Sequence, residues 1–188
     1  MRIISGAFKG KKILQPLDKS TRPLKDLAKE SIFNIIKHSK KFNIDFEKSY
    51  VLDLFSGVGS FGLECISRGV KFVTFVENYK VVLPILKKNL NYLKSVKNYR
   101  IIEKNILNDL NFESLNQKFN IIFLDPPYKD KNLSVVINKI IESKILSDGG
   151  IIIIHRHKKE LDEFPENLKI IEEKKYGISK IIFAKKLN

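Results

Sequence analysis

The sequence contains only one cysteine, Cys65, and three histidines among its 188 residues. A single cysteine excludes an intrachain disulfide, and no cysteine cluster with the spacing of a zinc site exists. The histidines, His38, His155 and His157, have no matching carboxylates or thiolates at metal-ligand spacing. We therefore predict a protein without a metal, in which Cys65 is a small buried side chain on a helix.

Long apolar segments are also absent. The longest apolar runs, such as residues 151–154, are far too short to span a bilayer, and residues 1–6 do not begin a signal peptide. Repeats and Gly/Ser-rich or Pro-rich linkers are lacking too, so we expect one structural unit with a single sizeable core. These absences predict a soluble, cytoplasmic protein, and we expect it to be a monomer.

Acidic residues are few relative to basic ones. The chain has 35 Lys and Arg against 21 Asp and Glu, which gives a net charge of +14. Such an excess favours a polyanionic partner, because lysine or arginine beside a phosphate releases condensed counterions. The alternative is that a composition rich in Lys, Ile and Asn uses lysine as generic surface charge. From charge we predict a nucleic-acid partner.

Apolar runs and amphipathic segments alternate from Tyr50 onward. This alternation predicts parallel strands joined by right-handed crossovers, with helices on both faces of the sheet. The predicted fold class is α/β and Rossmann-like, with a seven-stranded, mostly parallel sheet. Strands are expected at 50–55, 71–77, 99–103, 119–124, 150–155, 168–174 and 179–185, and helices near 60–68, 79–96, 107–116 and 132–146. Because Pro84 lies within 79–96, that helix is either kinked or begins later.

A glycine-rich loop follows the first strand of this alternation, where residues 51–62 read VLDLFSGVGSFG. Glycines let the backbone turn sharply and let a ligand approach closely. The spacing also satisfies Gly-x-Gly-x-x-Gly, which is found in dinucleotide-binding dehydrogenases. Asp53 argues against a dinucleotide, because its carboxylate would face the phosphates. The same carboxylate suits the cationic methionyl end of S-adenosyl-L-methionine (AdoMet).

Two later strand ends extend the predicted AdoMet site. Glu77 ends the second strand, where a carboxylate can accept hydrogen bonds from both ribose hydroxyls of an adenosine ligand. Asn105 follows the third strand, at a place where an amide can read the adenine edge. The predicted cofactor-binding residues are Asp53, Phe55, Ser56, Gly57, Gly59, Glu77, Asn105 and Asp125.

The fourth strand ends in the most informative motif of the chain, Asp125-Pro126-Pro127-Tyr128. Two consecutive prolines fix an extended backbone, so a rigid turn is the bland interpretation. The chemical interpretation starts from a base amino group, whose lone pair is delocalised into the ring. Asp125 and the Pro126 carbonyl can each accept one of its N–H groups, while Tyr128 stacks on the base. We predict Asp125, Pro126, Pro127 and Tyr128 as the catalytic residues.

These motifs together resemble class I, Rossmann-like methyltransferases that act on amino groups. The N-terminal segment is similar to the bacterial small-subunit ribosomal RNA guanine-N2 methyltransferase family, the RsmD type. This similarity is carried by RIISG at residues 2–6, Gly10, TRP at 21–23, and Asp26, Glu30, Phe33 and Asn34. The resemblance implies AdoMet as the methyl donor, and as the acceptor a guanine N2 amino group of 16S rRNA, in naked RNA or in an assembled particle.

The chain departs from this family at two places. Leu24 and Lys25 stand where the family usually has two threonines, and the fifth strand, which often ends in glutamate there, reads Ile154-His155-Arg156 here. Two other functions stay open. One is an adenine-N6 methyltransferase acting on DNA or RNA with the same four catalytic residues, and the other is a non-catalytic RNA-binding ribosome-assembly factor.

Residues 1–40 form an N-terminal extension to the methyltransferase domain of residues 41–188. A turn from Gly6 to Gly10 predicts a basic β-hairpin, and a helix is expected to begin near Pro23. The hairpin is too short for a core of its own, so we expect it to lie against the domain beside the cofactor edge. Its predicted RNA-binding residues are Arg2, Lys9, Lys11, Lys12 and Arg22.

Overall fold

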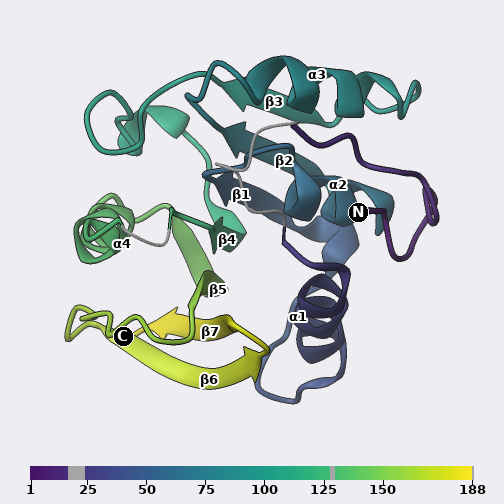
Figure 1. Cartoon of the computed structure of the whole chain (residues 1–188). Coiled ribbons are helices and arrows are strands. Elements are labelled where there is room, and N and C mark those ends of the chain that lie inside the picture. Colours follow the sequence, from purple (N-terminus) through teal and green to yellow (C-terminus); the bar gives the residue numbers. More distant parts are fainter. Residues whose placement is uncertain (17–23, 128–129, 188) are drawn as a thin grey trace.

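The structure is a computed structural model that describes residues 1–16, 24–127 and 130–187. Its centre is a seven-stranded sheet with the order β3-β2-β1-β4-β5-β7-β6 (Figure 1). β7 is antiparallel to both of its neighbours, and the other strand pairs are parallel. The strands are β1 (Tyr50–Leu54), β2 (Phe72–Val76), β3 (Tyr99–Ile102), β4 (Phe119–Leu124), β5 (Leu146–His157), β6 (Leu168–Tyr176) and β7 (Ser179–Lys186).

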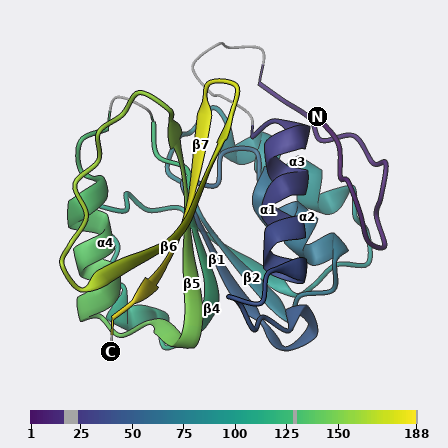
Figure 2. The ribbon, with the colours of Figure 1, turned by 90° about the horizontal axis from the view of Figure 1, so that it is seen from below.

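Helices cover both faces of this sheet. Figure 2 shows α4 on one side and α1, α2 and α3 on the other. Alternate residues of each strand supply the two cores, so that Val51 packs on the side of α1 to α3 while Leu52 packs on the side of α4. Strands buried on both faces require continuous apolar runs, and the Rossmann-like α/β prediction is confirmed. The helices are α1 (Asp26–His38), α2 (Ser60–Ser67), α3 (Leu83–Asn91) and α4 (Leu133–Glu142).

Two helix predictions need correction. The helix expected at 79–96 is shorter, Leu83–Asn91, and of the two alternatives that Pro84 leaves open it takes the later start, because proline is tolerated in the first turn. The helix expected at 107–116 is wrong, because this stretch contains only a short 3₁₀ turn, Glu113–Leu115. Asparagine side chains compete for its backbone, since Oδ1 of Asn105 accepts from Leu107 N and Oδ1 of Asn111 accepts from Glu113 N.

The N-terminal extension packs on α2, but its hairpin is reduced to a single bridge between Arg2 and Lys12. Ile3 and Ile13 are buried in the same core as α1 and the sheet. The glycine turn lies against the last residue of α2, where Ala7 N donates to the Ser67 carbonyl at 2.7 Å. α1 begins at Asp26, and the predicted start at Pro23 lies outside the described residues.

A buried ion-pair network fixes this extension in place. Lys29 on α1 is fully buried, with Nζ 3.8 Å from a carboxylate oxygen of Glu64 on α2 and 2.6 Å from the Arg2 carbonyl. The Glu64 carboxylate also accepts from Ile4 N at 2.7 Å and from Ser5 N at 3.0 Å. Burial lowers the pKa of Lys29, and the Glu64 charge partly offsets that shift. The extension is thus held by charges that water does not reach.

Candidate functional site

A cavity of about 1020 Å³ opens at the carboxyl ends of β1, β2 and β4. The strand order reverses between β1 and β4, and open α/β sheets bind ligands at such a switch point. The cavity lining includes nine residues predicted from the sequence: Asp53, Phe55, Ser56, Gly57, Glu77, Asn105, Asp125, Pro126 and Pro127. Gly59 is not among the lining residues, and Tyr128 lies outside the described residues.

The glycine loop between β1 and α2 has the backbone that a closely approaching ligand needs. Phe55, Gly57 and Gly59 all have positive φ, at 58°, 55° and 86°. A Cβ added to Gly57 would meet no atom within 4 Å, so this part of the loop is open to a ligand. A Cβ on Gly59 would lie 2.5 Å from the Leu86 side chain, so Gly59 serves the packing of the loop on α3.

Ser56 and Glu77 tie the glycine loop to β2. The Ser56 hydroxyl donates to the Asp53 carbonyl at 2.6 Å and accepts from Val76 N at 3.0 Å. One Glu77 oxygen accepts from Gly57 N at 2.7 Å, and the other accepts from Asn78 N at 2.9 Å. A carboxylate oxygen has more than one lone pair, so Glu77 can hold the loop and still accept from a ligand hydroxyl.

Asp53 is the most buried acidic group of the cavity, with 1% of its surface exposed. One of its oxygens accepts from Gly62 N, the third residue of α2, at 2.9 Å. Burial raises the pKa of Asp53 well above its usual value, the Gly62 N–H opposes this, and the charges of Asp125 and Glu77 raise the pKa further. No lysine, arginine or histidine is among the described lining residues. The cavity therefore favours a cationic ligand.

Asn105 has a structural task in addition to its place in the cavity wall. Its Oδ1 accepts from Leu107 N at 2.9 Å and from Asn108 N at 3.1 Å, which caps the turn that replaces the expected helix. Within the described residues, its side-chain nitrogen makes no hydrogen bond. The amide can therefore still donate to a ligand in the cavity.

Asp125 is held by two residues of the sheet that the sequence left without a role. Its Oδ1 lies 2.8 Å from Nδ1 of His155, and Nε2 of His155 lies 3.0 Å from the Ser179 hydroxyl. His155 ends the apolar run of β5, and Ser179 opens β7 directly opposite the end of β5. The departure of this strand end from the resembling family was the only sequence signal for His155.

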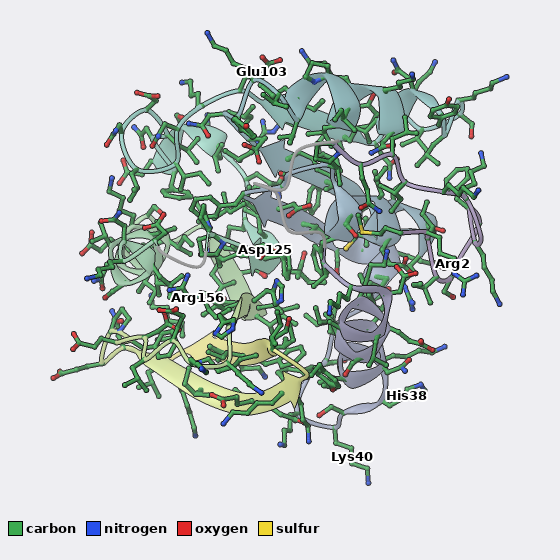
Figure 3. All side chains as sticks on the ribbon, in the orientation of Figure 1. Arg2, His38, Lys40, Glu103, Asp125 and Arg156 are labelled. Atoms are coloured by element: carbon green, nitrogen blue, oxygen red, sulfur yellow. The ribbon has the colours of Figure 1, made fainter. Side chains whose placement is uncertain are left out.

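Arg156, the next residue of β5, holds the backbone after Asp125; both residues are labelled in Figure 3. This buried guanidinium donates to the Pro127 carbonyl and to the Asp130 carbonyl, both at 3.1 Å. Its Nε donates to Asp162 at 2.8 Å, so the positive charge is paired. Sequence reasoning missed this clamp, because the residues it joins are far apart in the chain.

The basic residues of the extension are exposed. Contrary to the prediction, the glycine turn of the extension does not lie beside the cofactor edge. The turn packs on Ser67, at the end of α2 opposite to the glycine loop. Lys11 donates to the Tyr92 carbonyl at 3.3 Å, just beyond the end of α3. Figure 3 places Arg2 on the side of α1 to α3, apart from Asp125. Arg22 lies outside the described residues.

Neither a metal cluster nor a membrane-spanning helix is found in the described residues. No group of three or more His, Cys, Asp or Glu side chains in them is placed to hold a metal ion. None of the helices in this part of the chain has the length and apolar character needed to cross a membrane.

Comparisons with known proteins agree on one family. Residues 1–185 match the family model described as conserved hypothetical protein 95. A Bacillus subtilis protein with a provisional rRNA methyltransferase name is 34% identical over 99% of both chains. Ribosomal RNA small subunit methyltransferase D of Haemophilus influenzae is also 34% identical, over 95% of this chain and 90% of its own. A solved Escherichia coli structure, provisionally named a methyltransferase, has 29% identity and a TM-score of 0.79, and the match covers 100% of this chain and 98% of that one.

Proposed function

This chain belongs to the family described as conserved hypothetical protein 95, and from that premise we propose that it methylates the N2 amino group of a guanine in small-subunit ribosomal RNA. The name of the Haemophilus influenzae relative supports the RNA class. The guanine N2 atom is supported by the resemblance of the N-terminal motifs. The observation that carries the proposal is the single cavity in which Asp53, Glu77 and Asp125 converge.

The residues of this cavity fit AdoMet better than a dinucleotide. AdoMet supplies a methyl group activated by a sulfonium, and it carries an ammonium and an adenosine. The desolvated Asp53 carboxyl favours a cation, and Glu77 can accept from ribose hydroxyls. A pyrophosphate would instead meet four carboxylates, those of Asp53, Glu77, Asp125 and Asp130, with no cationic side chain among the described lining residues to offset them.

The Asp-Pro-Pro segment fits the amino acceptor. With Oδ1 engaged by His155, Oδ2 of Asp125 has no hydrogen-bond partner within the described residues. That oxygen and the Pro126 carbonyl can accept the two N–H groups of a base amine, which orients its lone pair. Methyl transfer would break the bond from the methyl carbon to the sulfonium sulfur as the new C–N bond forms, and would leave a surplus proton on the nitrogen, which the Asp125 carboxylate is placed to accept.

The deciding experiment uses small-subunit particles from a strain that lacks this gene. The protein is incubated with these particles and AdoMet carrying a labelled methyl group, and the modified nucleotide is mapped. We expect one guanine to gain a methyl group at N2. A methyl group on adenine N6 would favour the adenine-N6 alternative, and binding without transfer to particles or to naked RNA would favour the non-catalytic assembly factor.

We expect AdoMet binding to release protons through Asp53. The pKa of this carboxyl is raised in the free protein, and a bound cation lowers it by favouring the ionised form. AdoMet affinity should therefore rise with pH across the titration of Asp53. Calorimetry in two buffers of different ionisation enthalpy counts the protons released.

Asp53→Asn is the matched variant for this prediction, because its amide oxygen can still accept from Gly62 N. The variant should bind AdoMet more weakly and without the pH dependence. Equal heats in both buffers for the unaltered protein would contradict the role of Asp53. NAD is titrated in parallel, and tight NAD binding without detectable AdoMet binding would overturn the cofactor assignment.

The exposed lysines of the extension are proposed to contact RNA phosphates. Changing Lys9, Lys11 and Lys12 together to alanine should weaken RNA binding. The log–log slope of affinity against salt should flatten by up to about one unit for each phosphate that these side chains no longer neutralise. Filter binding over a range of salt concentrations measures both quantities.

A charge-matched control is available at exposed lysines in the last turn of α1 and in the residues that follow this helix. Changing Lys37, Lys40 and Lys48 to alanine removes the same charge from exposed positions outside the glycine turn. If both triple variants lower RNA affinity equally, the turn has no special role. Unchanged affinity in the first variant would make the extension a structural cover for α2.

A further inference from the structure

We infer that His155 is a positioning residue for the acceptor site, which orients the Asp125 carboxylate so that Oδ2 faces the incoming amino group. This inference rests on the proposed function, because it assigns Asp125 to the amino acceptor. His155 is 3% exposed and does not line the cavity, so it acts through Asp125.

The backbone around Asp125 is already fixed from both sides. Asp125 N donates to the Leu54 carbonyl of β1 at 3.3 Å, and Arg156 holds the Pro127 and Asp130 carbonyls. Rotation of the Asp125 side chain is the freedom that remains. The 2.8 Å contact between Oδ1 and Nδ1 of His155 removes that freedom.

The partners of His155 also fix its own orientation and tautomer. A carboxylate only accepts hydrogen bonds, so Nδ1 carries the proton that is donated to Asp125. In the neutral ring Nε2 then accepts, and the Ser179 hydroxyl 3.0 Å away can donate to it. β7 thereby supports β5, and β5 supports the carboxylate at the end of β4.

Two substitutions can separate the hydrogen bond that His155 makes to Asp125 from the contribution of His155 to packing. Nδ2 of an asparagine occupies nearly the position of a histidine Nδ1, whereas the amide of a glutamine reaches the position of Nε2. His155→Asn therefore keeps a donor for Asp125 and loses the contact with Ser179. His155→Gln keeps a partner for Ser179 and offers no donor to Asp125.

The test compares these two variants in single-turnover methyl transfer to small-subunit particles, with AdoMet binding and thermal unfolding measured on the same samples. We expect His155→Gln to lower the rate by about tenfold to a hundredfold, and His155→Asn to recover most of that loss. AdoMet affinity should change less than about twofold in both, since His155 does not line the cavity.

A double-variant cycle shows whether His155 acts through Asp125. In an Asp125→Asn background, His155→Gln should cause little further loss of rate, because the carboxylate that it orients is absent. An equal loss in both backgrounds, or His155→Gln with an unaltered rate, would overturn the inference. The inference would also be overturned if His155→Asn and His155→Gln lost transfer rate equally and in proportion to their loss of melting temperature. Lack of transfer by the unaltered protein would instead refute the proposed function.

Discussion

Asp125→Ala is expected to lower the rate of methyl transfer by at least about a hundredfold. The variant loses the oxygen that accepts an amino N–H, and so loses the orientation of the acceptor lone pair. AdoMet affinity should stay within a few fold, because Asp53 and Glu77 remain in the cavity. Single-turnover transfer and calorimetry measure the two quantities on the same preparation.

The control for this variant is Asp148→Ala, which removes an exposed aspartate from the early part of β5, away from the cavity. It should leave both the transfer rate and AdoMet affinity unchanged. If folded Asp125→Ala turned over at the rate of the unaltered protein, the catalytic role of Asp125 would have to be abandoned. A large loss of AdoMet affinity would instead assign Asp125 mainly to the cofactor.

The second large effect is expected on stability, from Glu64→Gln. The change keeps the volume of the side chain but leaves the buried Lys29 charge without its closest carboxylate on α2. Breaking one partner of a buried ion pair typically costs about 3–5 kcal/mol. Urea unfolding at neutral pH measures the change in the free energy of unfolding.

The pH dependence of this loss has a definite sign. The pKa of Lys29 is below its usual 10.5 in the folded protein. The unfolded chain therefore binds the extra proton between the two pKa values, and stability rises with pH in that range. Glu64→Gln lowers the folded pKa further, so the stability gap between variant and unaltered protein should narrow as the pH approaches 10.5.

Two further variants serve as controls for this prediction. Lys48→Ala breaks an exposed ion pair with Asp45 and should change stability by no more than about 1 kcal/mol. Lys29→Met combined with Glu64→Gln removes the unpaired buried charge, keeps an amide oxygen for the backbone N–H groups of the extension, and should recover part of the loss. A Glu64→Gln variant as stable as Lys48→Ala would show that water reaches the pair.

The strands and the cavity could be predicted from the sequence because their signals are local. Runs such as residues 151–154 are apolar throughout, and the glycine loop and the Asp-Pro-Pro segment stand at strand ends whose edge is set by the parallel topology. Carboxyl ends of neighbouring parallel strands meet at one edge, so Asp53, Glu77 and Asp125 had to converge.

The predictions that failed depend on two kinds of interaction. One is contact between residues far apart in the chain, and the other is local competition of side chains for backbone hydrogen bonds. Apolar residues at 106, 107, 110 and 115 suggested a helix, while Asn105 and Asn111 bind the backbone in turns instead. The sequence predicts the glycine turn beside the cofactor edge, because nothing near Gly6 indicates that Ser67 is its partner. For His155 the only signal in the sequence is a departure from a family pattern, because its partner Asp125 is 30 residues away.

The position of β7 has a consequence for how the molecule assembles. β7 follows β6 in the chain but lies between β5 and β6, so it pairs with both strands only after both have been made. Until β7 docks, β5 is an open edge that carries four consecutive isoleucines at 151–154. An unpaired edge with an apolar run of this kind is a template for pairing with other chains. Slow docking of β7 would therefore favour aggregation over folding, and the short turn between Tyr176 and Ser179 makes β6 and β7 a hairpin that brings this strand back quickly.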